Sequence, residues 1–526
     1  MSKPQIQILG PDGRPLRSAA AYTGAGAGFG GQMKEWTPAL KTADAALLPN
    51  LRLATARADD LGKNNALASG GLRAHVENVV GHLFRLNYKP RWKRLGIEEE
   101  DARSFIKDVE AIWAEIAEDP ANWIDAERSR TFTMMCREAV NTHIATGDVM
   151  AHVEWIEDRP GSLLKTAIKM VSPKRVCNPN LAPDTDTQRG GVKLDRHGAA
   201  LGYHVRSTSS LSGTGLGYSW EFLPREKAWG RPEFLHIFEP LEDGQTRGAN
   251  RFLAVMEQLH MMPKMQSTKL QNAIINAMFA ATIESELDTE AAFEMIAGEG
   301  GDKKLLNYMS MINEFHQASP IHLNGSRISH LLPGEKLNLK TPGSADNGYS
   351  DFETSIMRWI AAGSDLSFET VSRDFSRTNY SSARASMLLE WRFAMGRRKV
   401  IIERFASLVF RVVLEELVQR KLVKLPRSRF GFYEAMNAWC NCTWTGTGRM
   451  AIDGLKEVKE ALLKIEGGLS TYEKELSQMG EDYTEIFEQQ VREMRERTAA
   501  GLPPPSWMES YLSNQPDEGG APNGGN

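Results

Sequence analysis

The sequence predicts an α+β fold in which unusually long helices accompany a β-rich domain. The polar stretch Ser367–Glu390 runs into about forty residues that contain no proline and a single glycine, Gly396. A helix of that length would extend about 60 Å at 1.5 Å per residue, far beyond an ordinary domain helix. Between residues 130 and 240, apolar and polar residues alternate in short segments separated by Pro, Gly, Asn and Asp, a pattern typical of strands.

Composition and charge limit the classes of protein that fit. The 526 residues are 41% hydrophobic and 25% charged, which is ordinary for a chain with about two to four cores. No apolar run is long enough to span a membrane, and the first residues have no apolar signal core, so we expect a soluble protein that is not secreted. The net charge of −4 disfavours a broad basic face that grips nucleic acid, but it permits a protein that lets DNA slide past. We expect four reduced thiols, at Cys136, Cys177, Cys440 and Cys442.

The first half of the chain divides into three blocks. Residues 1–45 are rich in glycine and alanine and predict a flexible arm, whereas residues 50–115 have helical patterns. The strand candidates of residues 130–240 are VMAHVEWI, KTAIKMVSP, GYHVRS and FLHIFEP. From Gly248 the pattern is helical again, and Pro263 is expected to kink or split that helix.

The second half begins with an insert. Residues 287–345 predict a compact α/β insert with the strand candidates PIHLNG and KLNLKT, and Tyr349–Gly363 predicts the helix that leads into the polar loop. After Pro426 a short β/loop piece precedes three further helices, expected at Met450–Glu466, Thr471–Gln478 and Asp482–Arg497. The Pro-, Gly- and Asn-rich end predicts a disordered tail.

Segments that suggest an enzyme lack the rest of the required motif. Gly24–Gly31 and Leu211–Ser219 are rich in glycine like a phosphate-binding loop, but neither follows a strand or ends in GK[ST]. The eleven histidines form no HExxH motif, and His75, His82 and His236 lie among apolar residues, which favours structural roles. We therefore predict no catalytic residue, no metal site and no cofactor.

Basic residues concentrate around the polar loop and the start of the long helix. Four loop residues combine guanidinium and aromatic groups, which suits brief contact of a mobile loop with a polyanion: Arg373, Phe375, Arg377 and Tyr380. The alternative is that these side chains pack against the rest of the subunit and serve folding. Three consecutive basic residues follow in the helix, Arg397, Arg398 and Lys399, and we expect them to pair with acidic neighbours across helices or subunits.

Several runs resemble one protein family in colinear order. They are ADAALLPNLRLATARADDLGKNN (43–65), RTFTMMCREAV (130–140), MVSPKRVCNPN (170–180), FEPLEDGQTRGAN (238–250), FAATIESELDT (279–289), DNGYSDFE (346–353), YSSARAS (380–386) and GRMAIDGLKEVKEALLKIEGGLSTYEKEL (448–476). In these runs the chain resembles the portal proteins of long-tailed double-stranded-DNA bacteriophages, in particular the lambda type. The differences lie mainly in the loop SDLSFETVSRDFSRTN and in the C-terminal tail.

The resemblance implies the portal fold, in which a ring, usually of twelve subunits, is built from a wing, a stem, a clip and a crown around a central channel. Applied to this sequence, it implies a flexible N-terminal arm 1–39, a wing 40–247, a first stem helix 248–279, a clip 280–345, a second stem helix 346–363, a tunnel loop 364–382, a long wing helix with the following β/loop piece 383–447, crown helices 448–500 and a disordered tail 501–526.

The resemblance also implies a function. Double-stranded DNA, driven by a terminase large subunit docked on the clip, would pass through the ring, and the tunnel-loop residues would contact its backbone without reading its sequence. After filling, the clip would bind head-completion and tail-connector proteins instead. Major capsid and scaffold proteins are further implied partners, and a membrane is not. The expected location is the capsid portal vertex of the virion, reached by assembly in the host cytoplasm.

The last expectations concern the mobility of the polar loop and the alternatives to a portal. Gly348, Gly363 and the serine-rich YSSARAS segment are expected to let Ser364–Ser382 move relative to the stem. The alternatives to a portal are a viral phosphate-using or hydrolytic enzyme and a capsid-shell subunit.

Overall fold

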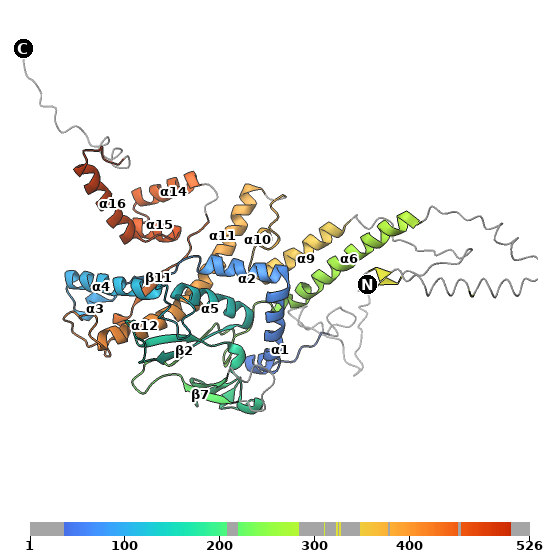
Figure 1. The fold of residues 1–526 in the computed structure, drawn as a ribbon, viewed down its shortest axis with the longest axis horizontal. Coiled ribbons are helices and arrows are strands. Elements are labelled where there is room, and N and C mark those ends of the chain that lie inside the picture. The colour runs from blue at the N-terminus through green and yellow to red at the C-terminus, as the bar shows by residue number, and fades with distance from the viewer. Residues whose placement is uncertain are drawn as a thin grey trace, which may run out of the picture.

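The structure is a computed structural model, and it describes residues 36–207, 219–282, 310, 322–323, 326–327, 348–376, 379–450 and 454–505. Two helices, α6 (Met256–Thr282) and α9 (Tyr349–Gly363), project together from one end of a body of helices and small sheets (Figure 1). The mixture of helices and antiparallel sheets confirms the predicted α+β class. Within the described residues, no helix combines the length and apolar character of a membrane span.

Helices dominate the N-terminal part of the body. They are α1 (Ala43–Asn64), α2 (Ala66–Val79), α3 (Trp92–Leu95), α4 (Glu99–Ala117) and α5 (Phe132–Thr146). Asn65 separates the first two, and its side chain caps α2 by accepting a hydrogen bond from the amide of Ala68 at 3.0 Å. The acidic first turn of α4 suits the helix dipole. Helix α5 was not predicted, because it lies in the region assigned to strands.

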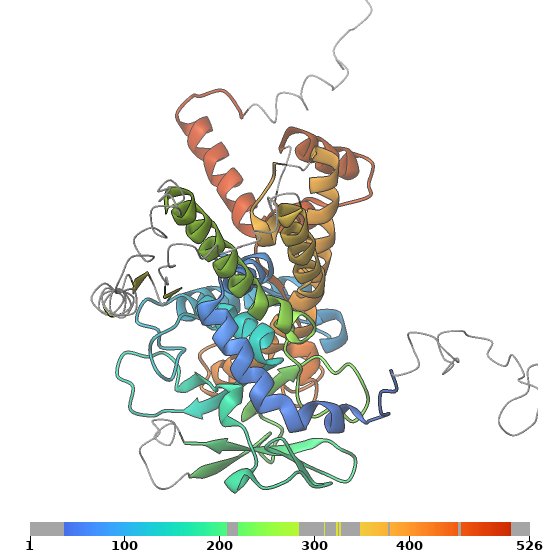
Figure 2. The ribbon, with the colours of Figure 1, turned by 90° about the vertical axis from the view of Figure 1, so that its right-hand side faces the viewer.

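Two antiparallel sheets form the β-rich part. One has the order β3-β2-β8, with β2 (Asp148–Trp155) between β3 (Thr166–Met170) and β8 (Phe234–Phe238). The other has the order β4-β5-β6-β7, and its strands are Gln188–Arg189, Val192–Leu194, Ala200–Arg206 and Trp220–Pro224. All four strand candidates of this region are confirmed as β2, β3, β6 and β8. In Figure 2 the four-stranded sheet lies at the bottom and the C-terminal helices lie at the top.

A third sheet pairs distant parts of the chain. Strand β1 (Arg85–Tyr88) runs antiparallel to β11 (Cys442–Thr445), with Leu86 opposite Trp444. The alternation in these four-residue strands is too short to predict from sequence. The pairing attaches the segment after the long helix to the N-terminal helices.

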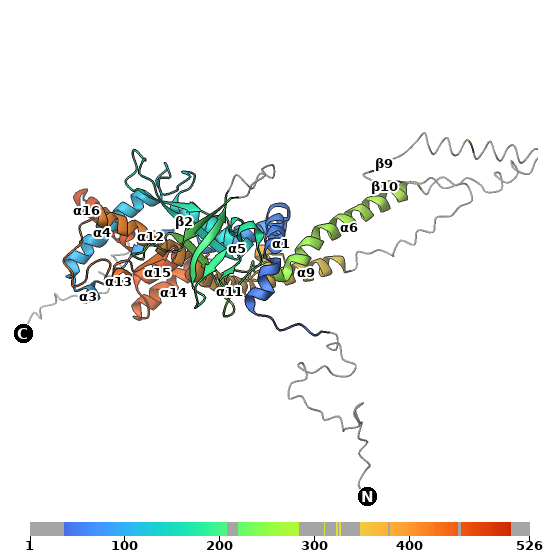
Figure 3. The ribbon, with the colours of Figure 1, turned by 90° about the horizontal axis from the view of Figure 1, so that it is seen from below.

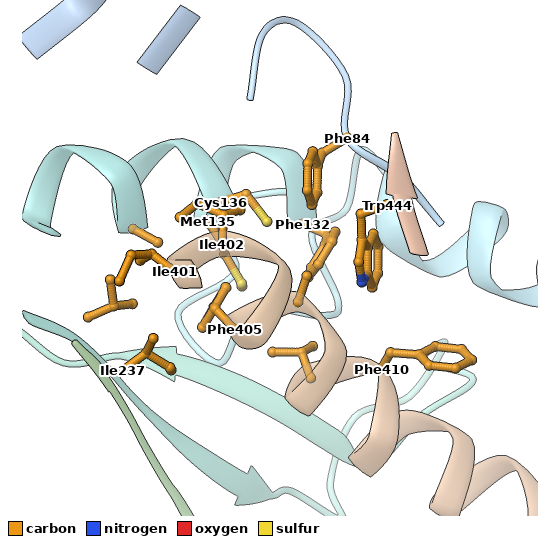
Figure 4. Packing of buried hydrophobic residues seen from close by; sticks show 14 of the residues in the cluster. Phe84, Phe132, Met135, Cys136, Ile237, Ile401, Ile402, Phe405, Phe410 and Trp444 are labelled. Atoms are coloured by element: carbon orange, nitrogen blue, oxygen red, sulfur yellow. The ribbon is translucent and has the colours of Figure 1, made fainter. Parts of the chain in front are cut away.

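The main hydrophobic core surrounds α12 (Glu403–Gln419), as Figure 4 shows. Phe405 and Phe410 of this helix are fully buried, Phe405 between α5 and the β3-β2-β8 sheet and Phe410 against the rings of Tyr88 and Trp113. Aromatic rings fill the end of the core near β11: Trp444 stacks parallel to Phe84 with ring centres 5.4 Å apart, and Phe132 lies 5.3 Å from the Trp444 ring. This core joins the β3-β2-β8 sheet to the helices, whereas the four-stranded sheet packs in a second cluster that includes Val192, Tyr203 and Phe234.

The long helix predicted from the absence of proline is confirmed. It runs without a break from α11 (Tyr380–Arg397) through a π-helical turn at Arg398–Ile402 into α12. Helix α12 is mostly buried, whereas α11 buries only one narrow stripe, Glu390, Ala394 and Arg397. On its open side α11 exposes Leu388, Leu389 and Phe393. Its buried stripe therefore contains two charged side chains, and its exposed side carries large apolar ones.

The two projecting helices contact each other along their length. Pro263 lies inside α6, and the helix is not split there. Gln266 of α6 donates a hydrogen bond to the Glu353 carboxylate of α9 at 2.6 Å. Of the predicted insert that follows α6, the described residues include β9 (His322–Leu323), within PIHLNG, paired with β10 (Ser326–Arg327). The KLNLKT candidate, the N-terminal arm to residue 35 and the tail from residue 506 lie outside the described residues.

The three C-terminal helices are confirmed as α14 (Gly454–Glu466), α15 (Tyr472–Met479) and α16 (Tyr483–Ala499). Ion pairs between exposed side chains link them to the body: Arg85–Glu485 at 2.9 Å, Lys89–Glu473 at 2.5 Å and Lys107–Glu488 at 3.0 Å. In each pair the acidic partner belongs to the C-terminal helices. Such solvent-exposed pairs are weak and sensitive to salt.

Candidate functional site

The segment between α9 and α11, residues 364–379, is called here the α9–α11 connection. It contains a short helix, α10 (Phe368–Ser372), which Ser367 caps by accepting the amide of Thr370 at 3.1 Å. The helix ends at Arg373, whose φ of 56° lies in the left-handed region. Asn379 then caps α11 by accepting the amide of Ser382 at 2.8 Å. Part of the predicted loop is thus regular secondary structure.

A buried histidine and a buried arginine hold the start of this connection. His75 of α2 donates from Nε2 to the carbonyl of Ser364 at 3.0 Å, and its Nδ1 accepts from Arg397 Nη1 at 2.9 Å. Only a neutral ring with its proton on Nε2 satisfies both neighbours, since a carbonyl accepts and a guanidinium donates. Arg397 also pairs with the carboxylate of Asp365. Burial lowers the pKa of His75 well below its usual value, and the nearby Arg397 charge lowers it further.

A buried carboxylate, the Glu390 latch, holds the first turn of α10. Glu390 accepts hydrogen bonds from the Ser367 amide at 3.0 Å, from the Thr370 hydroxyl at 2.7 Å and from the Asn78 side chain at 2.5 Å. Its exposed fraction is 8%. The latch therefore links α10 on one side to α2 on the other through a single side chain of α11.

Close packing fixes the end of α9. A Cβ placed on Gly363 would approach Cγ1 of Val255 to 2.3 Å, so only glycine fits at this contact. The next residue, Ser364, is buried and its hydroxyl donates to the Ile360 carbonyl at 2.7 Å. Gly363 is thus held by its neighbours, in contrast to the expected hinge. Gly348, with a φ of 123°, has open space around it.

Elsewhere the described residues show a buried ionic cluster without catalytic geometry. Asp148 accepts from Arg247 Nε at 2.8 Å and lies 2.9 Å from His236 Nε2. Burial alone would raise the pKa of Asp148, but Arg247 and His236 lower it to about 2. Arg247 also donates to the carbonyls of Val176, Gly190 and Pro173, which fixes loops of the β-rich part. The side chains of His75 and His236 are buried and have polar partners, whereas His82 is exposed.

No group of three His, Cys, Asp or Glu side chains in the described part of the chain is placed to hold a metal ion. Two hollows lie on the surface of the described part of the chain. One, of about 310 Å³, is lined by residues of β2 and of the loop before β8, and the other, of about 500 Å³, lies beside Trp123. Neither contains the Asp148 cluster.

Comparison with known proteins decides the family. The sequence model described as phage portal protein, lambda family, matches residues 29–398. The chain is 51% identical over 525 residues to the portal protein of Escherichia phage N15, and the alignment covers 98% of each chain. It is 50% identical over 528 residues to portal protein B of Escherichia phage lambda, again with 98% of each chain covered. The chain belongs to the lambda family of phage portal proteins.

The matches to solved structures are weak in both geometry and sequence. The neck of a native GTA particle matches with a TM-score of 0.37 at 10% identity, covering 81% of this chain and 93% of that one. A chain in the virion of a native gene transfer agent particle matches with a TM-score of 0.39 at 10% identity, covering 87% of this chain and all of that one.

Of the residues expected to contact DNA, the structure describes the side chains of Arg373 and Phe375, at the tip of the α9–α11 connection. Arg373 and Phe375 are exposed, and the Phe375 side chain has 60% of its surface accessible. Arg377 lies outside the described residues, and Tyr380 is the first residue of α11, with its side chain outside what the structure describes. The connection thus joins a buried base at residues 364–367 to an exposed tip at residues 373–376.

The basic residues expected at a subunit interface have partners within the same chain. Arg398 donates to the carbonyls of Val79 at 2.7 Å and Thr447 at 2.9 Å, and burial lowers its pKa to about 10, so it stays charged at neutral pH. Arg397 pairs with Asp365 of the α9–α11 connection, and Lys399 pairs with Glu403 of its own helix at 2.7 Å.

Burial separates these three residues. Arg397 and Arg398 are each only 7% exposed, so little of either remains to contact another subunit. Their substitution would disturb the subunit itself before any interface. Lys399 is exposed and stays a candidate for a contact between subunits.

Sequence reasoning missed the side chains that support the connection, namely His75, Asn78 and Glu390. One signal was available. Glu390, Ala394 and Arg397 are spaced at i, i+4 and i+7, which places two opposite charges on the same face of the predicted helix. The contribution of α2 had no local signal, because it depends on how distant segments pack.

Proposed function

We propose that the chain assembles into a dodecameric ring at one capsid vertex, and that double-stranded DNA enters and leaves the capsid through its channel. The observation that carries this proposal is the identity of about half of all positions with two portal proteins over 98% of the chain. The family division into wing, stem, clip, tunnel loop and crown, with the boundaries given above, is part of the proposal.

Exposed apolar surface supports assembly with further copies. On α11, Leu389 is 56% and Phe393 is 52% exposed. On α9 the corresponding values are 57% for Phe352 and 64% for Trp359, and α14 exposes Leu455 and Leu463 still more. Side chains of this size in rows on several helices are normally covered in the functional state of a protein. A ring places one face of each subunit against a different face of the next subunit, which can cover such surfaces.

The α9–α11 connection is proposed as the element that contacts DNA. Its exposed tip presents Arg373 and Phe375, and the proposal extends to the neighbouring Arg377 and Tyr380. A guanidinium on a short exposed loop can bind a phosphate and release it, and backbone contacts of this kind carry no sequence preference. Because the base is fixed by His75 and the Glu390 latch, force on the tip would be transmitted to α2 and α11.

The remaining partners follow from the family. The terminase large subunit would bind the clip during packaging, and head-completion and tail-connector proteins would replace it. Major capsid and scaffold proteins would surround the wing. The chain would act in the virion at the portal vertex after assembly in the host cytoplasm, and it would hydrolyse nothing itself. No observation favours a hydrolytic enzyme or a capsid-shell subunit.

Two measurements test this function. Negative-stain microscopy of the purified chain is expected to show rings with a central hole, and closed shells or monomers would contradict the proposal. In a packaging assay, the double variant R373A/R377A is expected to form normal rings and heads but to retain less DNA. The control R52A/R57A, which removes two exposed arginines of α1, is expected to package fully.

The outcomes of the packaging assay are separate. Loss of rings in R373A/R377A would show that the two arginines serve folding. Normal rings that hold full-length genomes would remove the DNA-contact role of the tip while leaving the portal assignment intact.

A further inference from the structure

Basic residues without acidic neighbours are concentrated in two segments that the proposed DNA channel does not use. The segment RLNYKPRWKRLGI (85–97) and the segment RKLVKLPRSRFGFY (420–433) each hold five basic residues and no acidic residue. The whole chain has 63 basic and 67 acidic residues, so this separation of charge is local.

The two segments lie side by side in the fold. The Arg429 amide donates to the Leu95 carbonyl at 2.8 Å, and a Cβ on Gly96 would lie 3.4 Å from the Cβ of Arg429. Nearby, the Arg91 amide donates to the carbonyl of Ala438 at 2.9 Å. Figures 1 and 3 show α3 and the chain that follows α12 at the end of the body opposite to α6 and α9. Five exposed residues at this end form what we call the basic tip: Arg91, Lys93, Arg94, Arg427 and Arg429.

The side chains of the basic tip have no carboxylate partner among the described residues, unlike many basic residues elsewhere in the subunit. Lys93 lies 5.2 Å from the ring centre of Trp92, and Arg429 lies 5.4 Å from that of Phe430. These contacts orient the side chains without neutralising them. The adjacent basic residues Arg85 and Lys89 are instead paired with the C-terminal helices. In the acidic first turn of α4, which follows the tip, Glu99 pairs with Arg103.

We propose that the basic tip binds the phosphate backbone of double-stranded DNA on the outside of the ring, separately from the channel. Two features favour DNA over an acidic protein. Five unneutralised guanidinium and ammonium groups in adjacent loops suit a polyanion with regularly spaced charges. Apart from Tyr433, which is 45% exposed and donates its hydroxyl to Glu415, the two segments lack the exposed large apolar side chains that form the centre of a protein interface. The aromatic rings of Trp92 and Phe430 are half-buried.

The position of the basic tip gives this contact a physical consequence. The tip lies at the end of the subunit remote from the paired helices α6 and α9, which the proposed function places along the channel (Figure 3). In a ring it would recur once per subunit around the periphery. Each copy would bind DNA weakly, and the contacts would add up along a duplex that follows the rim. The proposal rests on the ring for this repetition, but binding by a single copy does not depend on it.

The test uses a covalently closed circular plasmid, because a closed circle cannot thread the channel. Filter binding of purified full-length rings to this plasmid is measured at NaCl concentrations between about 50 and 200 mM, with the plasmid concentration held constant. The variant R91Q/K93Q/R94Q removes three tip charges, and R427Q/R429Q tests the second loop independently. The control R57Q/R492Q/R495Q removes three exposed basic residues from α1 and α16.

We expect the triple tip variant to bind the circle at least about tenfold more weakly at 100 mM NaCl, and the slope of log K against log [NaCl] to become shallower by about two or more. The control is expected to stay within about twofold of the parent. R373A/R377A rings are expected to bind the circle normally, so failure of the channel proposal and failure of the tip proposal give different results.

Three results would overturn the proposal. The first is unchanged binding and unchanged salt dependence in both tip variants. The second is loss of rings in both tip variants, which would make this surface a contact between subunits. The third is that the tip variants bind the circle normally but no longer bind poly-glutamate, which would assign the tip to an acidic protein partner.

Discussion

Removal of the Glu390 latch tests how the α9–α11 connection is held. In Glu390→Ala, the Ser367 amide, the Thr370 hydroxyl and the Asn78 amide all lose a buried acceptor. Each such hydrogen bond contributes about 1 to 1.5 kcal/mol net, so the loss of all three costs about 3 to 4.5 kcal/mol. That free energy would act on the local opening of the connection rather than on the main core, because the latch lies outside the aromatic cluster around α12.

Hydrogen exchange followed by mass spectrometry measures this opening directly. At about 1.4 kcal/mol per tenfold change, the amides of residues 366–372 are expected to exchange at least about a hundredfold faster in Glu390→Ala. In Glu390→Gln the new amide can face Asn78, whose own amide can turn to accept it. The remaining oxygen then keeps Ser367 and Thr370, so the expected acceleration is only about fivefold, for a loss near 1 kcal/mol.

A matched control is Glu100→Ala, which removes an exposed carboxylate from α4. It is expected to leave the exchange of residues 366–372 unchanged. If Glu390→Ala also leaves these amides within about twofold of the parent, the latch does not hold α10 and the reasoning is refuted. Acceleration throughout α12 would instead show that the cost falls on the core.

Two further predictions concern the surroundings of the connection. Gly363→Ala places a methyl group against Val255 and is expected to lower the free energy of unfolding, measured by urea denaturation, by about 1 to 3 kcal/mol. Adding Val255→Ala to this variant is expected to restore part of the lost stability. If the second substitution restores none, the packing argument is wrong. Burial, with the charges of Arg251 and Arg397, lowers the pKa of His143 to about 3, below its usual value of 6.5. As the pH falls, His143 therefore binds a proton in the unfolded chain before it does so in the folded chain. The stabilisation from neutral His143 is complete above pH 6.5 and is lost as the pH falls towards 3. Thermal unfolding between pH 7 and 5 is expected to show a smaller loss of Tm in His143→Gln than in the parent, and equal losses would exclude this source of acid sensitivity.

Much of the fold could be predicted because it depends on local pattern. The absence of proline after Tyr380, the alternation in β2, β3, β6 and β8, and the spacing of the C-terminal helices each report a property of neighbouring residues. Helix α5 was missed for a different reason: it ends immediately before β2, within the region that was assigned to strands. The β1–β11 pair was missed because strands of four residues give almost no periodic signal.

The supports of the candidate site could not be predicted in this way. Arg398 is stable in the interior because carbonyls of Val79 and Thr447 surround it, and these residues come from segments far away in the chain. The basic run at residues 397–399 therefore resembles a surface patch in the sequence and a set of internal contacts in the fold. Arg373 and Phe375 lie on an exposed tip, which was predicted, but the buried base below them was not.

The π-helical turn at Arg398–Ile402 sets the angular phase between the two halves of the long helix. Such a turn accommodates one more residue than an α-helical turn, and each residue turns an α-helix by about 100°. If the same residues wound as a regular α-helix, the additional residue would rotate α11 by that angle relative to α12. Glu390 and Arg397 would then turn away from α10 and His75, although every residue that makes those contacts would still be present. The orientation of the proposed DNA-contact loop is thus encoded partly in a residue count and not only in side-chain chemistry.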